Sequence, residues 1–242
     1  ISHGRARFTD LERIVDGMSH DRINRYMRNH TLTSRALWRA VRPHIVLSDS
    51  GYIAFDDTVL SKQYAHKIEL TRRQWSGNAK AIIQGIGVVT CVYVSPELAA
   101  FWPIDFRFQP DADGFSKHQH VQHMLSNAIS IKKLGTPKLL VDSWYATKPL
   151  FLHAEALGLT YYAPIKGNRI VRLQPEDDHQ DQRADTIRWS PDTRQHGVLV
   201  HLRAMPKDHT VRLFRVPVSS DRVDLVVTND RLRLLPPYGT EP

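Results

Sequence analysis

Two short apolar segments of the chain each run into aspartate, and this pattern indicates metal chemistry. Residues 52–55 precede Asp56 and Asp57, and residues 138–141 precede Asp142. A short apolar segment bounded by turn-forming residues is typical of a buried strand, so each carboxylate is expected at the edge of a sheet. Two such carboxylates on neighbouring strands can share one Mg²⁺ ion, since this cation prefers carboxylate oxygens, water and substrate phosphate. The arrangement suits metal-assisted cleavage of phosphodiesters.

Each aspartate also has an ordinary interpretation, because Asp is common in turns and at helix caps after a strand. The occurrence of two such sites favours the metal site. Side chains alternate between the two faces of a strand, so Asp56 and Asp57 cannot both point toward Asp142. Both remain candidates for the first ligand at this point.

The composition is that of a soluble globular protein with a basic surplus. Its 242 residues, 41% hydrophobic and 24% charged, suffice for one large domain or a domain with an appendage. The net charge of +8 and the pI near 9.7 favour a polyanionic partner, most often nucleic acid. The lone Cys91 excludes disulfides and Cys-based zinc motifs and predicts a cytoplasmic location. No segment is as long as a membrane span, so no membrane partner is expected.

Residues 1–48 are predicted to be helical and rich in arginine, with Ser19 and either Thr33 or Ser34 as helix N-caps. Two interpretations of this region stay open. It is either a small DNA-binding head of helix-turn-helix type or a helical cap whose basic face is solvated.

Residues 49–169 are predicted to form an α/β fold, with a mixed sheet and helices in the order of a ribonuclease H-like core. The expected strands cover residues 52–55, 79–94, 101–108, 138–141 and 161–165, with helices over 115–134 and 147–157. Residues 170–230 are predicted to be a β-rich insertion, with alternating strands at 186–189, 198–203, 211–216 and 223–227. Residues 231–242 are expected to be an aberrant or truncated tail.

Several motifs of this sequence resemble those of bacterial insertion-sequence transposases of the DDE class. The segment 141–145 (VDSWY) is similar to the family's Asp-x-x-Tyr segment, and residues 162–169 (YAPIKGNR) are similar to its Lys-x-Asn-Arg segment. Residues 55–58 (FDDT), with Lys62, look like the motif of the first aspartate. The similarity covers roughly residues 50–230, and the β-rich part looks like an insertion that one group of the family carries.

The resemblance implies Mg²⁺ or Mn²⁺ as cofactor, with Asp56 and Asp142 as metal ligands and catalytic residues. Its Asp-x-Thr pattern favours Asp56, and Asp57 is the alternative. The family adds a third ligand, a Glu on a helix, but here Asn229 is soon followed by two prolines, and Glu241 lies beyond them. We therefore expect a truncated or frameshifted transposase with two of the three ligands and little cleavage activity. The initial Ile likewise predicts that the true start is missing.

The resemblance also implies double-stranded DNA, as element ends and target, as the partner, and leaves a homodimer open. The residues expected to bind this DNA are Lys62, Arg72, Arg73, Lys166 and Arg169. Two rival functions remain. The chain is either a non-catalytic DNA-binding remnant, or a ribonuclease H-like nuclease that uses Asp111 or Asp113 as a different third ligand.

Aromatic residues and histidines near these motifs have two interpretations each. Trp75 and Trp144 are candidates for stacking on an extruded base, although core packing is the favoured role of Trp144. Three histidines have spacings that suggest a metal at first sight, but a helix would turn the first two apart, so we interpret them as surface or interface residues. They are His118, His120 and His123.

Overall fold

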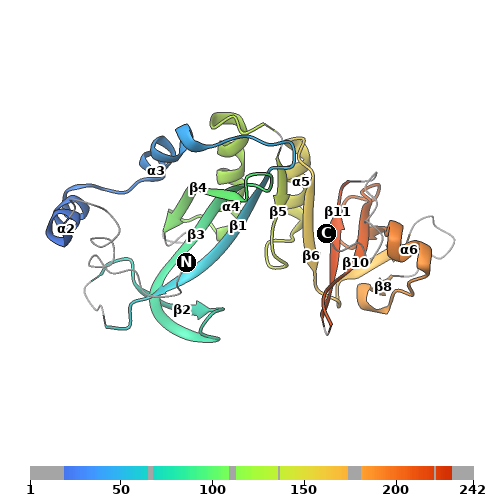
Figure 1. The fold of residues 1–242 in the computed structure, drawn as a ribbon. Coiled ribbons are helices and arrows are strands. Elements are labelled where there is room, and N and C mark those ends of the chain that lie inside the picture. Colours follow the sequence, from blue (N-terminus) through green and yellow to red (C-terminus); the bar gives the residue numbers. More distant parts are fainter. Residues whose placement is uncertain are drawn as a thin grey trace.

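The computed structural model describes residues 19–64, 68–108, 113–135, 137–173, 181–220 and 222–230. One sheet of eleven strands runs through them in the order β2-β3-β1-β5-β6-β11-β10-β9-β7-β8, with β4 paired to β3 (Figure 1). The strands are β1 (Tyr52–Ser61), β2 (Arg72–Ser76), β3 (Ala81–Ser95), β4 (Ala100–Phe108), β5 (Lys138–Leu140), β6 (Tyr161–Ile165), β7 (Ile170–Leu173), β8 (Gln182–Arg183), β9 (Val198–Leu202), β10 (Val211–Ser219) and β11 (Arg222–Thr228).

The first half of the sheet confirms the predicted mixed α/β architecture. β3 is antiparallel to both β1 and β4, whereas β1, β5 and β6 are mutually parallel. β1 is longer than predicted, because its pairing with β3 continues to Ser61 opposite Gly85. Asp56 and Asp57 therefore lie inside a strand and not at its end. Beyond Leu140, the last residue of β5, β1 has no neighbouring strand on that side among the described residues. The edge of β1 is therefore open from Phe55 onward, where the two aspartates lie.

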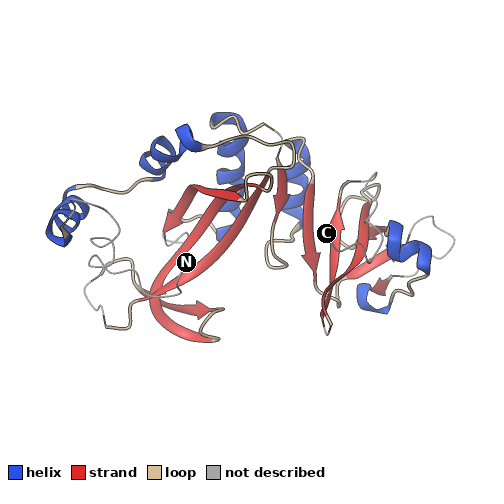
Figure 2. Cartoon of the chain, in the orientation of Figure 1, coloured by secondary structure: helices blue, strands red, loops and turns tan. Residues whose placement is uncertain are grey.

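Helices cover one face of this half of the sheet (Figure 2). The α-helices are α2 (His20–Asn29), α3 (Ser34–Val41), α4 (Lys117–Ser126), α5 (Lys148–Ala156) and α6 (Pro191–His196), and a π-helical turn (Asn127–Ile131) extends α4. Met124 and Leu125 of α4 are buried against the sheet, as helical spacing predicts, and so are Leu150 and Phe151 of α5. This packing fixes the beginning of α4 beside β1.

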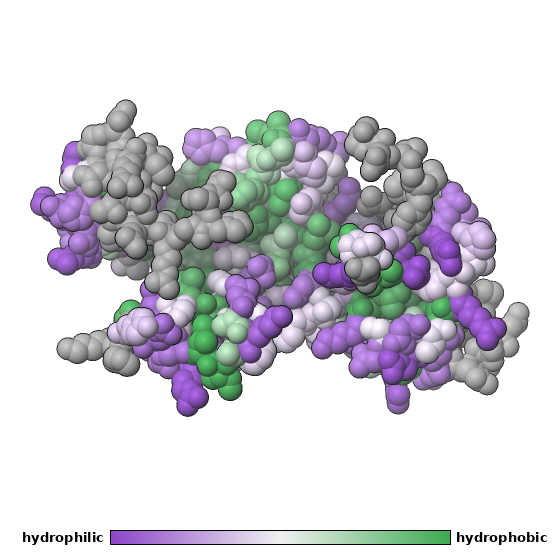
Figure 3. All heavy atoms as spheres, turned by 60° about the horizontal axis from the view of Figure 1, so that its bottom comes forward, coloured by the Kyte–Doolittle hydropathy of each residue, from purple (hydrophilic) through white to green (hydrophobic). Residues whose placement is uncertain are grey.

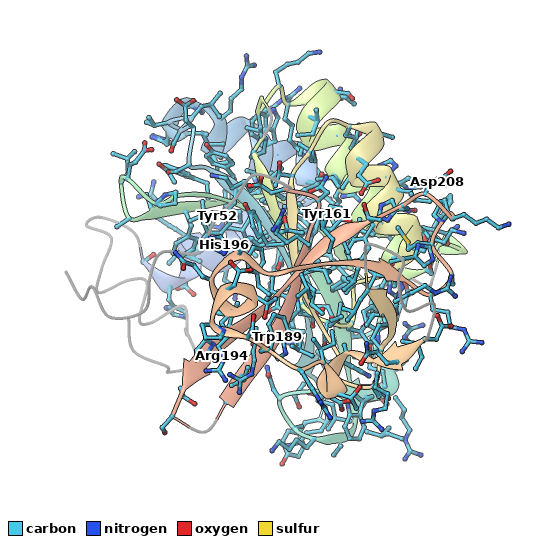
Figure 4. The ribbon with its side chains drawn as sticks, turned by 90° about the vertical axis from the view of Figure 1, so that its right-hand side faces the viewer. Tyr52, Tyr161, Trp189, Arg194, His196 and Asp208 are labelled. Carbon is cyan, nitrogen blue, oxygen red and sulfur yellow. The ribbon has the colours of Figure 1, made fainter. Side chains whose placement is uncertain are left out.

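The β-rich segment continues the same sheet, because β11 pairs antiparallel with β6 from Thr228 opposite Tyr162 to Leu225 opposite Ile165. Asp208, in the turn before β10, lies on the α5 side of this segment, and Trp189 and Arg194 lie on the other side (Figure 4). The predicted strand at 186–189 is wrong, since a 3₁₀ turn ends at Thr186 and no strand follows until β9. The boundary proposed at residue 170 stays a prediction.

The N-terminal helices begin where the sequence predicts. Ser19 caps α2 by accepting a hydrogen bond from the Arg22 backbone N–H, and Thr33 caps α3 in the same way. α3 packs along β4, and the Lys132 ammonium lies over the Trp38 ring, 5.7 Å from its centroid. Among the described residues, no helix has the length and apolar character needed to cross a lipid bilayer.

Candidate active site

A cleft of about 530 Å³ opens where β1 passes the end of β5. Its walls come from β1, the β2–β3 hairpin, the first turn of α4 and the turn that follows β5. Asp56, Asp57 and Asp142 all line this cleft, so the structure brings the predicted carboxylates together. The predicted DNA-binding residue Arg72 lines it too.

Asp56 lies in β1, and Asp142 lies two residues beyond the end of the adjacent parallel strand β5. The pairing of β1 with β5 ends at Ala54 opposite Leu140, and two further residues in this register bring Asp56 level with Asp142. One oxygen of each carboxylate is held by the backbone. The Asp57 N–H donates to Asp56 Oδ1 at 2.9 Å, and the N–H groups of Trp144 and Tyr145 donate to Asp142 Oδ1 at 3.0 and 3.1 Å. The Oδ2 atoms have no hydrogen-bond partner within the described ranges.

Asp57 points to the opposite face of β1, on the side where Ile53 and Phe55 are buried. Both of its carboxylate oxygens have partners. Lys117 Nζ donates to Oδ2 at 2.6 Å, and the Tyr145 hydroxyl donates to Oδ1 at 3.3 Å. The two consecutive aspartates therefore differ in surroundings, since one is paired with side chains and the other is open to the cleft.

The surroundings of Asp56 raise its proton affinity. Burial raises the pKa of Asp56 above the ordinary value of 3.8, the charges of Asp57 and Asp142 raise it further, and the Asp57 N–H opposes these effects. Burial also raises the pKa of Tyr145, and the charge and hydrogen bond of Asp57 add to this shift. Tyr145 therefore keeps its proton, and its hydroxyl donates a hydrogen bond to Asp57.

The other predicted DNA-binding residues lie outside this cleft. Arg73 is exposed on the alternate side of β2, and Lys62 follows the end of β1. Lys166 is exposed directly after β6. Arg169 lines a separate hollow of about 390 Å³ together with Arg203 of the β-rich segment.

Two indoles line the acidic cleft, which contradicts the core role expected for Trp144. This side chain is 48% exposed and Trp75 is 62% exposed. Trp144 faces outward because the turn after β5 buries the next residue, Tyr145, which is 1% exposed. The β2–β3 hairpin adds exposed apolar surface through Ile82, opposite Trp75, and apolar side chains gather in that region of the surface (Figure 3).

The three histidines do not form a metal site, but one of them is not a surface residue. His120 is buried and its Nε2 lies 3.0 Å from Asp113 Oδ1. His118 stacks on the Trp144 ring with a centroid distance of 4.3 Å. His123 is exposed. Sequence spacing missed these roles because they depend on neighbours outside the helix.

Sequence reasoning also missed Lys117, the one described lysine that lines the cleft. A local signal did exist. Ser116 and Gln119 form a capping box, a pattern that marks the start of α4 in the sequence. The capping box places Lys117 in the first helical turn, but only the packing of α4 on the sheet brings its ammonium to Asp57.

Within the described residues, no three His, Cys, Asp or Glu side chains gather as a ready-made metal site. Asp113 is engaged with His120 and does not line the cleft, so its predicted role as a third ligand is not supported. Asp111 and the tail at 231–242, with Glu241, lie outside the described residues. The described cleft thus offers two open carboxylates.

Comparison with known proteins places the chain in a family. Residues 17–200 match the model of the DDE superfamily endonucleases. A piggyBac transposase, solved in a synaptic complex with hairpin DNA, is similar at 13% identity and a TM-score of 0.43. That match covers 94% of this chain and 48% of the transposase chain, so this chain spans about half of its length. A search of curated proteins finds no match. Since the family model covers most of the chain, it belongs to the DDE superfamily endonucleases.

Proposed function

We propose that this chain carries the two-aspartate part of a transposase active site, which performs metal-dependent DNA cleavage and strand transfer for an insertion sequence. Asp56 and Asp142 are the proposed metal ligands. The observation that supports this most is that both line the same cleft, Asp56 in β1 and Asp142 two residues past the end of the adjacent parallel strand β5, with one open oxygen each. The membership in the DDE endonucleases supports DNA as the substrate.

The donor set fits Mg²⁺ or Mn²⁺. Both ions accept carboxylate oxygens and keep other positions for water and phosphate, and the backbone N–H groups hold Asp56 and Asp142 without using their second oxygens. When bound, such ions activate a water or a 3′-hydroxyl for attack and stabilise the charge that develops on the phosphate. A bound metal would also offset the burial and the neighbouring charges that raise the pKa of Asp56.

The protein residues have separate tasks in this proposal. Asp56 and Asp142 orient the ions, and Tyr145 anchors the turn that carries Asp142 by burying its ring beneath it. Arg72 adds positive charge to the wall of the cleft, where it would meet the DNA backbone. Lys62, Arg73, Lys166 and Arg169 lie outside the cleft, and contacts with flanking DNA stay a prediction for them.

We further propose a ribonuclease H-like core for residues 49–169. The support is the order β4-β3-β1-β5-β6, with an antiparallel first part and three parallel strands after it. Asp56 lies in β1 of this sheet, and Asp142 follows the neighbouring strand β5. The β-rich segment then joins at β6, as expected of an insertion.

The proposal can be tested by nicking of supercoiled plasmid DNA in Mn²⁺ or Mg²⁺. We expect metal-dependent nicking that Asp56→Asn and Asp142→Asn each abolish, whereas the exposed Asp208→Asn retains it. The rate should be low, because the described cleft offers two open carboxylates, those of Asp56 and Asp142. Nicking that survives both substitutions would overturn the assignment. DNA binding without nicking would favour the alternative of a non-catalytic DNA-binding remnant, and cleavage of arbitrary nucleic acid would favour a nuclease.

A further inference from the structure

Lys117 is fixed in the acidic cleft by two partners. Its Nζ lies 2.6 Å from Asp57 Oδ2 and 5.6 Å from the centroid of the Trp144 ring, and its side chain is 18% exposed. Both partners are themselves held in place. The other oxygen of Asp57 accepts the Tyr145 hydroxyl, and Trp144 stacks on His118. A lysine side chain held in this way loses little further freedom when it binds a ligand.

An ammonium has three N–H donors, and the described residues take one of them through Asp57. The remaining donors lie in a cleft with two carboxylates that suit metal ions. A neutral or cationic ligand has no reason to prefer Lys117, whereas a phosphodiester carries the anionic oxygens that an ammonium binds. The geometry therefore favours phosphate as the ligand of this residue.

We propose that Lys117 binds a phosphate of the DNA in this cleft, and that Asp57 is the residue that positions it and not a metal ligand. This inference rests on the proposed function, because it requires DNA in the cleft. It assigns different tasks to two adjacent aspartates. Asp56 faces the metal site, and Asp57, on the other face of β1, aims a lysine at the substrate.

The competing interpretation is that Lys117 only neutralises Asp57. The two interpretations differ in a double variant. If neutralisation is the sole role, removing both charges with Asp57→Asn/Lys117→Ala should restore both stability and DNA binding. If Lys117 binds phosphate, the double variant should regain stability but not DNA binding, because no cation remains at that place.

The experiment measures binding of a duplex oligonucleotide at a fixed Ca²⁺ concentration while KCl is varied. Ca²⁺ is used because it fills carboxylate sites readily. Loss of one lysine–phosphate contact should reduce the slope of log affinity against log salt by about 1 in both Lys117→Ala and the double variant. The matched control is Lys207→Ala, an exposed lysine in the turn between β9 and β10, which should leave the slope unchanged.

A wild-type slope and affinity in the double variant would overturn the inference. So would loss of Mn²⁺ binding in Asp57→Asn, because Asp57 would then be a ligand. Failure of the proposed function is separate from both results. It would appear as unchanged Mn²⁺ binding in Asp56→Asn and Asp142→Asn, whatever the salt dependence of the Lys117 variants.

Discussion

Replacing Asp142 separates its structural role from its role toward a metal. Asp142 Oδ1 accepts two backbone hydrogen bonds that close the turn after β5, and Oδ2 is open to the cleft. The side-chain oxygen of Asn can keep both bonds, but it carries no charge for a divalent ion. Asp142→Asn should therefore fold normally and lose metal binding, whereas Asp142→Ala should lose both the turn and the metal.

The magnitudes follow from these contacts. Each backbone bond to the carboxylate contributes about 1 kcal/mol at this exposed site, so Asp142→Ala should cost roughly 2 kcal/mol of unfolding free energy. Asp142→Asn should be neutral or slightly stabilising without metal, since it removes a charge that raises the pKa of Asp56. At a Mn²⁺ concentration about 100 times Kd, the wild type should gain about 2.7 kcal/mol. For a chain of this size that gain raises Tm by roughly 5–11 °C.

The assay is thermal unfolding with and without Mn²⁺, with Asp208→Asn as the control for removal of an exposed carboxylate. We expect the wild type and this control to show the metal-induced rise in Tm, and both Asp142 variants to lack it. A full rise in Asp142→Asn would refute the reasoning, because the metal would then bind without the open oxygen. An apo Tm of Asp142→Asn as low as that of Asp142→Ala would refute the account of the turn.

Three further outcomes are expected. The raised pKa of Asp56 means that metal-free stability should fall as pH rises from below 3.8 through its folded-state pKa, and Asp56→Asn should remove this dependence in pH-dependent denaturation. Trp144→Ala should weaken binding to single-stranded DNA by about 5- to 150-fold in fluorescence anisotropy, whereas Trp189→Ala should not. Asp105→Ala should lower the unfolding free energy in urea by about 3–5 kcal/mol, because Lys132, 2.6 Å away, stays buried without its partner.

The sequence predicted the parts of the site that depend on strand period. The apolar residues before Asp56 and Asp142 predicted two buried strands, and alternation predicted that Asp56 and Asp57 face apart. The length of β1 was not predictable in this way, because its continuation depends on hydrogen bonds to β3. β2 was not predictable either, because its polar sequence forms a strand only through pairing with residues 81–85 of β3.

Side-chain roles that depend on tertiary packing were beyond the sequence. The burial of Tyr145 and the exposure of Trp144 follow from the direction of one turn, which no spacing rule sets. Lys117 reaches Asp57 across 60 positions of the chain. Its role follows from the packing of α4 on the sheet, and not from its own neighbours in sequence.

The pairing of β11 with β6 also determines when the core can be completed during synthesis. β6 ends at Ile165, but its partner β11 begins at Arg222, so one edge of β6 stays open while the intervening residues are made. An open edge invites pairing with other nascent chains. Pro164 in β6 lacks an N–H and therefore offers that edge one donor fewer. Pro164 thus reduces the number of hydrogen bonds that a foreign strand could form with β6 before β11 is made.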